Sequence, residues 1–254
     1  MNLPELLSPG LLGIIFIILF TALMTGFTFA RRSQPVRFLR TIPAFSRLAR
    51  AIGLAVEAGN RLHVSLGRGE LNGIEGGAAL IGLTVLQRIA RVASASDRPP
   101  VATSGTGTLT VLSQDTLRST YRRMGAADQL EPASGQLTGL TPFSYAAGVL
   151  PVIQDQQVSA TFLAGHLGSE AALIADAGER DGSLTLAGSD QIPGQAVLYA
   201  TAQELLIGEE LFAAGAYMQA GPMHFASLRA QDVMRWVLII VILAGLIARA
   251  AGVL

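Results

Sequence analysis

Two long apolar segments frame a central region in which short apolar runs alternate with helical patterns. Residues 11–30 hold only uncharged side chains, and about twenty such residues are enough to cross a bilayer as a helix. The second segment, within residues 226–254, has a shorter uninterrupted core, which reaches spanning length only if Trp236 lies at one interface and Arg249 extends toward the headgroups. The pattern predicts two transmembrane helices, with a re-entrant or buried helix as the alternative for the second.

The central region, residues 61–225, predicts an α/β domain. The predicted strands are 62–66, 101–104, 158–164 and 183–187, and the predicted helices are 77–95, 109–124, 170–177 and 196–218. A further helix is expected in the apolar stretch LTPFSYAAGVLPV between the two halves. This order predicts a mainly parallel sheet with helices on both faces, built from two βαβα halves in a Rossmann-like arrangement.

Residues 31–60 form a basic linker and then an amphipathic stretch over 43–58. Such a stretch beside a membrane helix fits the headgroup layer, where arginines attract anionic lipid. The alternative is that its apolar side packs on the domain that follows. Both placements are open at the level of the sequence.

The distribution of arginine predicts the orientation in the membrane. Glu5 is the only ionisable side chain before the first apolar segment, so a cleaved signal peptide is not favoured. Four arginines follow that segment and, with Trp236, are predicted to lie at the membrane interface: Arg31, Arg32, Arg37 and Arg40. The positive-inside rule therefore places the amino terminus, residues 1–10, outside and the α/β domain in the cytoplasm. Arg229 and Arg235 precede the second segment, so the carboxyl terminus is expected outside as well.

Composition excludes several kinds of chemistry. The chain is 50% hydrophobic and 14% charged, which is too apolar for an ordinary soluble domain, and its zero formal net charge argues against nucleic acid as a partner. It contains no cysteine, and all 18 of its basic residues are arginine. A thiolate nucleophile, a Walker A lysine and a Schiff-base lysine are therefore all missing. We predict no metal, no cofactor and no catalytic residue.

Glycine-rich turns follow the four predicted strands, at 67–73, 104–108, 165–170 and 188–194. Ligands bind beyond the carboxyl ends of strands in open α/β sheets, so a small-ligand site is one interpretation. It would use these glycines and hydroxyl residues: Gly67, Gly69, Gly73, Ser104, Thr106, Gly165, Ser169 and Ser189. The alternative is that tight turns need glycine whatever they face.

The turn GRGELNG is one residue away from the dinucleotide-binding fingerprint GxGxxG. Arg68 is the only fixed cation in the four turns, and these acidic residues accompany it: Glu70, Glu75, Glu170 and Asp190. A phosphate would be repelled there unless Mg²⁺ bridged it or the carboxylates pointed away. Nucleotide binding is therefore an open but disfavoured interpretation.

Two other groups of residues suggest chemistry or assembly. His166 is close in sequence to Ser169 and Glu170, which suggests acid–base catalysis, although a histidine at a strand end commonly bonds a backbone carbonyl. Glu209 and Glu210 lie in an otherwise apolar helical stretch. They are candidates for a subunit contact, because an unpaired buried carboxylate is costly. The alternative is that they only place negative charge at the N-terminus of a second helical segment.

Several sequence blocks resemble a family of uncharacterised bacterial membrane proteins. The blocks are AVEAGNRLHVSLG, FSYAAGV, AGHLGSEAALIADAG, LIGEELFAAGAYM and SLRAQD followed by a hydrophobic tail. The resemblance implies a domain of unknown function between two transmembrane helices in the bacterial inner membrane. It supports the α/β fold, supplies no activity or cofactor, and does not extend to the turn at 67–73.

These observations favour a non-enzymatic scaffold or assembly subunit, with the lipid bilayer, copies of itself and other membrane proteins as its partners. Small residues four apart in the two apolar segments would let helices approach closely: Ala22, Gly26 and Ala30, and Ala244, Ala248 and Gly252. The second hypothesis is a small-ligand sensor that uses the strand-end turns. An enzyme that uses His166 or Glu170 is the third.

Overall fold

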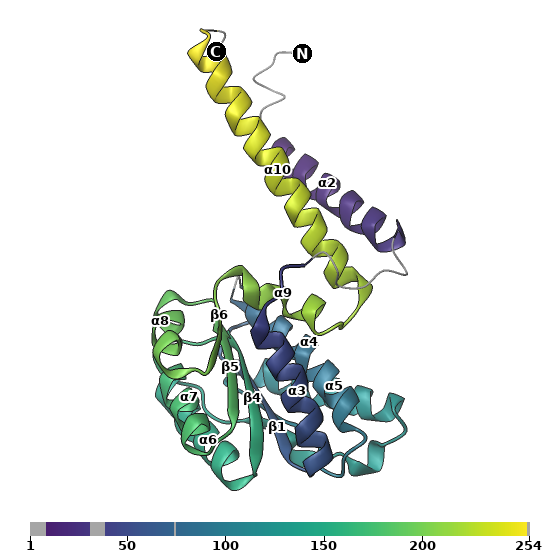
Figure 1. Cartoon of the computed structure of the whole chain (residues 1–254), viewed down its shortest axis with the longest axis vertical. Coiled ribbons are helices and arrows are strands. Elements are labelled where there is room, and N and C mark those ends of the chain that lie inside the picture. The colour runs from purple at the N-terminus through teal and green to yellow at the C-terminus, as the bar shows by residue number, and fades with distance from the viewer. Residues whose placement is uncertain (1–8, 31–38, 74, 253–254) are drawn as a thin grey trace. The chain divides into compact units, whose positions relative to one another are not determined.

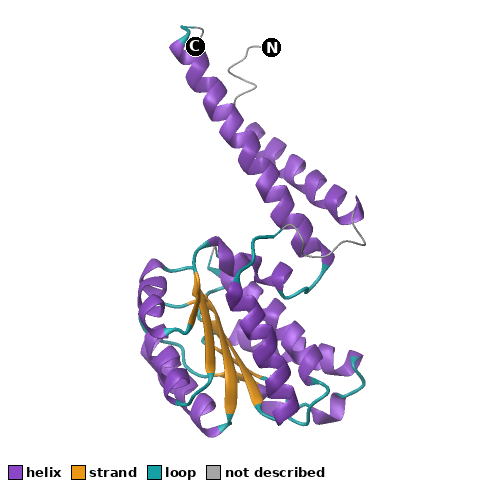
Figure 2. Ribbon diagram, in the orientation of Figure 1, coloured by secondary structure: helices purple, strands orange, loops and turns teal. Residues whose placement is uncertain are grey.

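The computed structural model describes residues 9–30, 39–73 and 75–252, which belong to two compact units (Figures 1 and 2). One unit comprises residues 40–220 and contains the sheet. The other comprises the two terminal segments, up to residue 39 and from residue 221 onward. The α/β unit therefore starts earlier than the predicted boundary at residue 61, because it includes the amphipathic stretch.

A parallel sheet of six strands, in the order β3-β2-β1-β4-β5-β6, lies at the centre of the α/β unit. The strands are β1 (Arg61–Gly67), β2 (Val101–Ser104), β3 (Gly135–Leu137), β4 (Val158–His166), β5 (Leu184–Ser189) and β6 (Glu204–Leu206). From β1 the chain adds strands outward to β3 and then returns to place β4 on the other side of β1. The direction of strand addition thus reverses between β1 and β4, at the topological switch point of the sheet. The predicted α/β class and parallel sheet are confirmed.

Helices cover both faces of this sheet (Figure 1). One layer contains α3 (Pro43–Ala58), α4 (Gly76–Ala93), α5 (Gly107–Arg123) and α9 (Glu209–Tyr217). The other contains α6 (Pro142–Asp155), α7 (Ala171–Arg180) and α8 (Ile192–Thr201). Two 3-10 turns, Ala127–Gln129 and Pro132–Ser134, lie between α5 and β3. Alternate side chains of β1 point to opposite faces of the sheet. Leu62, Val64 and Leu66 belong to the core on the face covered by α3, α4, α5 and α9, whereas Ser65 contacts Tyr145 of α6 on the other face.

The amphipathic stretch packs on the domain. The apolar side of α3 is buried in the core that the sheet shares with α4 and α9. The ring of Phe45 stacks on that of Tyr217, with centroids 4.8 Å apart, and Arg47 forms an ion pair with Glu204 of β6. Because the domain already covers this apolar face, it is not available to the headgroup layer.

The prediction of one helix over 196–218 is wrong. The structure has α8, the short strand β6 and α9 in this region. Gly208, at a φ of +55°, separates β6 from α9, and such a backbone conformation favours glycine. Strand β3 was also missed, since it falls in the stretch where only loop and helix were expected.

The terminal segments form two long helices, α2 (Pro9–Ala30) and α10 (Pro222–Ala250), which lie side by side and antiparallel (Figure 1). Both are long and apolar enough to cross a membrane. The 29 residues of α10 form one uninterrupted helix, roughly 44 Å long at about 1.5 Å per residue, so the second segment has spanning length without its tail. Helix α4 meets the same criterion of length and hydropathy, but more than half of it is buried, which makes it a core helix.

The residues predicted at the membrane interface fall in different places. Trp236 lies on α10 and its side chain is exposed. Arg40 belongs to the α/β unit, where its guanidinium pairs with Glu210 and its carbonyl accepts a hydrogen bond from Tyr217. Three further arginines lie outside the described residues: Arg31, Arg32 and Arg37.

Candidate functional site

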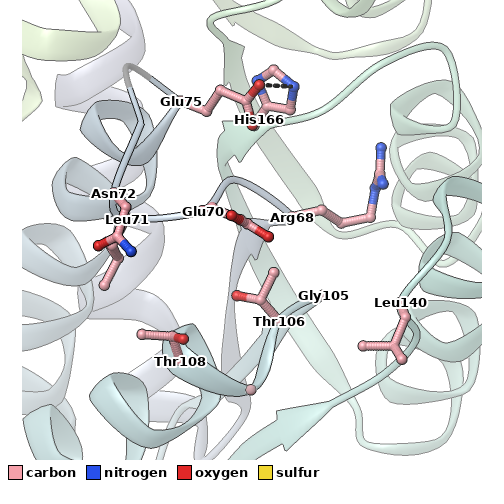
Figure 3. Close-up of a pocket in the computed structure, with 11 residues that line it drawn as sticks. Arg68, Glu70, Leu71, Asn72, Glu75, Gly105, Thr106, Thr108, Leu140 and His166 are labelled. Atoms are coloured by element: carbon pink, nitrogen blue, oxygen red, sulfur yellow. Dashed lines mark ion pairs between the residues drawn. The ribbon is translucent and has the colours of Figure 1, made fainter.

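A crevice of about 860 Å³ opens at the carboxyl ends of β1, β2 and β4, at the switch point of the sheet (Figure 3). Three segments supply most of its walls: the loop between β1 and α4, the turn between β2 and α5, and the end of β4. One more residue comes from the loop before α6. The lining residues are Arg68, Glu70, Leu71, Asn72, Glu75, Gly105, Thr106, Gly107, Thr108, Leu140 and His166.

The glycines at the rim have steric reasons inside the protein. Gly67 has a φ of +67°, and a Cβ on it would lie 2.9 Å from the backbone nitrogen of His166. A Cβ on Gly69 would lie 2.5 Å from the carbonyl oxygen of Glu75, and one on Gly165 would lie 2.1 Å from that of Leu66. Close packing of the turns therefore explains these three glycines without a ligand. Gly73 is less confined, because the nearest atoms to a Cβ there would lie 3.9 Å away.

Arg68 is engaged by the protein. Its guanidinium lies 3.4 Å from the carboxylate of Glu170, a side chain that is only 3% exposed. The stem of Arg68 fills the space beside Gly105, where a Cβ would lie 2.2 Å from Cγ of the arginine. The single arginine in the four turns is therefore fixed by a buried partner of opposite charge.

His166, at the end of β4, is held between two carboxylates. Its Nδ1 lies 3.1 Å from both carboxylate oxygens of Asp190, and its Nε2 lies 3.7 Å from Glu75. The side-chain amide of Gln191 also contacts Nε2. The predicted trio is not assembled, because the side-chain contacts of His166 among the described residues go to these groups, while Glu170 pairs with Arg68 and Ser169 is solvent-exposed.

The N-terminus of α5 forms the wall opposite the β1–α4 loop. Thr106 caps this helix, and its hydroxyl accepts a hydrogen bond from the amide of Leu109 at 3.4 Å. A Cβ on Gly107 would meet no atom within 4 Å, so the space beside this residue is open. This wall offers hydroxyls and backbone amides without a charged side chain.

Of the eight ligand-binding candidates, Thr106 lines the crevice, whereas the others shape or flank the turns. The hydroxyl of Ser104 bonds Thr110 at 2.7 Å, and that of Ser189 donates to the carbonyl of Leu167 at 2.6 Å. Sequence reasoning did not select Leu71, Asn72, Thr108 or Leu140. Nothing in the sequence pointed to Leu140. It lies in the loop between β3 and α6, so its position at the crevice depends on a strand that the sequence pattern did not predict.

A buried hydrogen-bond network ties the crevice floor to the sheet. The hydroxyl oxygen of Tyr145 lies 2.6 Å from Ser65 Oγ and 3.2 Å from Thr103 Oγ1, and it accepts a hydrogen bond from the Gly67 amide at 3.3 Å. His63 Nε2 lies 2.8 Å from the same Thr103 oxygen. Burial raises the pKa of Tyr145, opposed by its hydrogen bonds, and lowers the pKa of His63 to about 3.

The acidic pair of the LIGEEL block lies in the first turn of α9. Glu210 pairs with Arg40 at 2.5 Å and accepts a hydrogen bond from the Ile207 amide. Glu209 also has an interaction within the chain. Carboxylates are favourable at a helix N-terminus, so the pair has a structural role inside the domain. Among the described residues, no group of three His, Cys, Asp or Glu side chains could hold a metal ion.

The strand order and the crevice define an open, doubly wound α/β domain whose cavity lies at the switch point. Two helices of membrane-spanning length and composition accompany it. The chain belongs to the family of the domain of unknown function DUF6754, whose family model matches residues 9–254. No curated protein and no solved structure matches the chain significantly.

Proposed function

We propose that this chain is a membrane-anchored binding protein that holds a small polar ligand in the crevice between the β1–α4 loop and the N-terminus of α5. The observation that carries the proposal is the position of the crevice at the switch point, the place where open α/β sheets bind ligands. Its volume of about 860 Å³ is within the range of small-molecule sites.

The lining supports binding rather than a specific reaction. Hydroxyl, amide and carboxylate groups from separate segments converge on one space, which is typical of recognition by hydrogen bonds. The His166–Asp190 pair has the orientation of a general base, with Nδ1 held by a carboxylate. No nucleophile among the described crevice residues is bonded to it, so binding is the function that the geometry supports best.

The proposal includes a place in the cell. We expect α2 and α10 to cross the inner membrane of a bacterium, with the α/β unit in the cytoplasm and both termini outside. The exposed apolar side chains of both helices support the membrane part, and the arginines after α2 support the orientation.

The scaffold hypothesis loses one of its arguments. The acidic pair on α9 is engaged inside the domain, so it does not call for a second subunit. Homo-oligomerisation and contacts with other membrane proteins stay predictions, which rest on the small residues of the apolar segments.

The test uses the full chain in detergent and a panel of neutral, cationic and anionic metabolites, with thermal stabilisation as the readout. The blocking variant is Gly107→Trp, because its side chain would project into the open space of the crevice. The matched control is Val111→Trp on the same helix, at a residue that is 65% exposed. We expect a metabolite that stabilises the wild type and Val111→Trp but not Gly107→Trp. Equal stabilisation of both variants, or none of the wild type, would refute the proposal.

A further inference from the structure

The described lining of the crevice has acidic groups on one wall and no free cation to balance them. Building on the proposed function, we propose that its ligand is a small metabolite that carries a protonated amine and no phosphate. The amine would lie beside Glu70 and Glu75, and the rest of the molecule would reach the hydroxyls of Thr106 and Thr108 on the opposite wall (Figure 3).

The first argument concerns the place where a phosphate would bind. In sheets of this strand order, a diphosphate lies at the N-terminus of the helix that follows the first strand. That helix is α4 in this chain, and Glu75 is the residue directly before it. Glu70, from the same loop, also lines the crevice. A phosphate there would lie beside two carboxylates, and its charge would be repelled.

The second argument is that both basic side chains among the described lining residues already have a carboxylate within 4 Å. Arg68 extends away from Glu70 in Figure 3 and pairs with the buried Glu170. His166 is shared by Asp190 and Glu75, so even a protonated imidazole would balance only one of these two carboxylates. When the partners Glu170 and Asp190 are counted with the lining residues Glu70 and Glu75, four carboxylates face Arg68 and His166. Carboxylates therefore outnumber cations in either protonation state of His166.

The third argument is that Glu70 is accessible to a ligand. Its side chain is solvent-exposed, and its carboxylate points toward Thr106 in Figure 3. Within the described ranges, Glu70 has no ion pair or side-chain hydrogen bond. A protonated amine would give this carboxylate a charge-assisted partner, and Asn72 adds a neutral amide to the lining of the crevice.

The walls also exclude a purely apolar ligand. Leu71 and Leu140 are the only large apolar side chains among the described lining residues, and they come from different segments. Hydroxyls and open backbone amides make up the α5 side. These groups suit hydroxyl, carboxylate or amide functions on the same molecule, so amino sugars, amino alcohols and amino acids share the required chemistry.

The experiment is isothermal titration of the full chain in detergent with three amines, namely putrescine, ethanolamine and glucosamine, and with two phosphates, ADP and NAD⁺. The variants are Glu70→Gln and Glu75→Gln, and the matched control is Glu179→Gln, an exposed carboxylate of α7. We expect at least one amine to bind and no phosphate to bind. Each crevice variant should bind that amine about tenfold more weakly, which corresponds to about 1.4 kcal/mol. The control variant should bind the amine as tightly as the wild type does.

Binding of ADP or NAD⁺ without binding of an amine would overturn the inference but leave the proposed function intact. Amine binding that is equal in all three variants would overturn it too, because it would show non-specific attraction. If none of the five probes binds, the inference fails. The thermal-stabilisation test with the metabolite panel and Gly107→Trp then decides separately whether the crevice binds a ligand.

Discussion

The hydroxyl of Tyr145 lies 2.6 Å from Ser65 Oγ and accepts the amide hydrogen of Gly67, so a residue of α6 fixes the place where β1 becomes the crevice loop. The same hydroxyl reaches Thr103 on β2. One phenol therefore holds the carboxyl ends of two neighbouring strands, and the backbone of Gly67 starts from a position set by the sheet core.

We expect Tyr145→Phe to fold but to lose about 1–3 kcal/mol of stability, because the Gly67 amide and two hydroxyls lose a buried partner. Thermal unfolding of the full chain in detergent measures this loss. Hydrogen exchange over residues 67–75 should become faster. Tyr199→Phe is the control, since Tyr199 is 77% exposed. If the two variants unfold at the same temperature, the network does not stabilise the fold.

His63 gives the protein a predictable response to acid. Its pKa is about 3 in the folded chain, against about 6.5 when unfolded, so between these values the unfolded chain binds a proton that the folded chain does not. The contribution of His63 to stability is therefore full above pH 6.5 and falls as the pH drops toward 3. Between these pH values, the contribution of His63 to the free energy of unfolding should change by up to about 1.4 kcal/mol per pH unit.

The comparison of wild type with His63→Gln isolates this effect from other titrating groups. The variant keeps a neutral polar side chain near Thr103 but cannot take up a proton. Between pH 6 and pH 4.5, its unfolding temperature should fall less steeply than that of the wild type. Parallel curves would show that His63 is not the group responsible.

The orientation can be tested with single cysteines, because the chain has none of its own. A membrane-impermeant maleimide added to intact cells should label Asn2→Cys. It should label Asp181→Cys, at an exposed position of the α/β unit, only after lysis. Labelling of Asp181→Cys in intact cells would place the domain outside and reverse the proposed topology.

The periodic parts of the fold were predictable from the sequence. Strands β1, β2, β4 and β5 and helices α4 to α7 lie within a few residues of their predicted bounds, because buried strands and amphipathic helices have distinct hydrophobic periods. The segment from Ala200 to Glu210 misled the prediction. Its Ala, Gln, Glu and Leu residues favour helix, yet pairing with β5 makes Glu204–Leu206 a strand, and tertiary contacts override propensity.

The candidate site was predictable only in its location. The crevice lies among the predicted strand-end turns, but the pattern of glycines and hydroxyls selected residues that the turns need for their own packing. The crevice is lined instead by side chains whose direction depends on loop geometry, such as Glu70 and Asn72. The pairing of His166 with Asp190 also joins the ends of two strands, and their adjacency follows from strand order rather than from sequence spacing.

The contact between Phe45 and Tyr217 has a consequence for how the domain is connected. The α/β unit begins at Arg40 and ends at Ala220, and near that end the Tyr217 hydroxyl donates a hydrogen bond to the Arg40 carbonyl. Start and finish of the domain are thus neighbours, which is the geometry of a module inserted into a host chain. We expect such a module to be exchangeable for another domain whose ends lie close together.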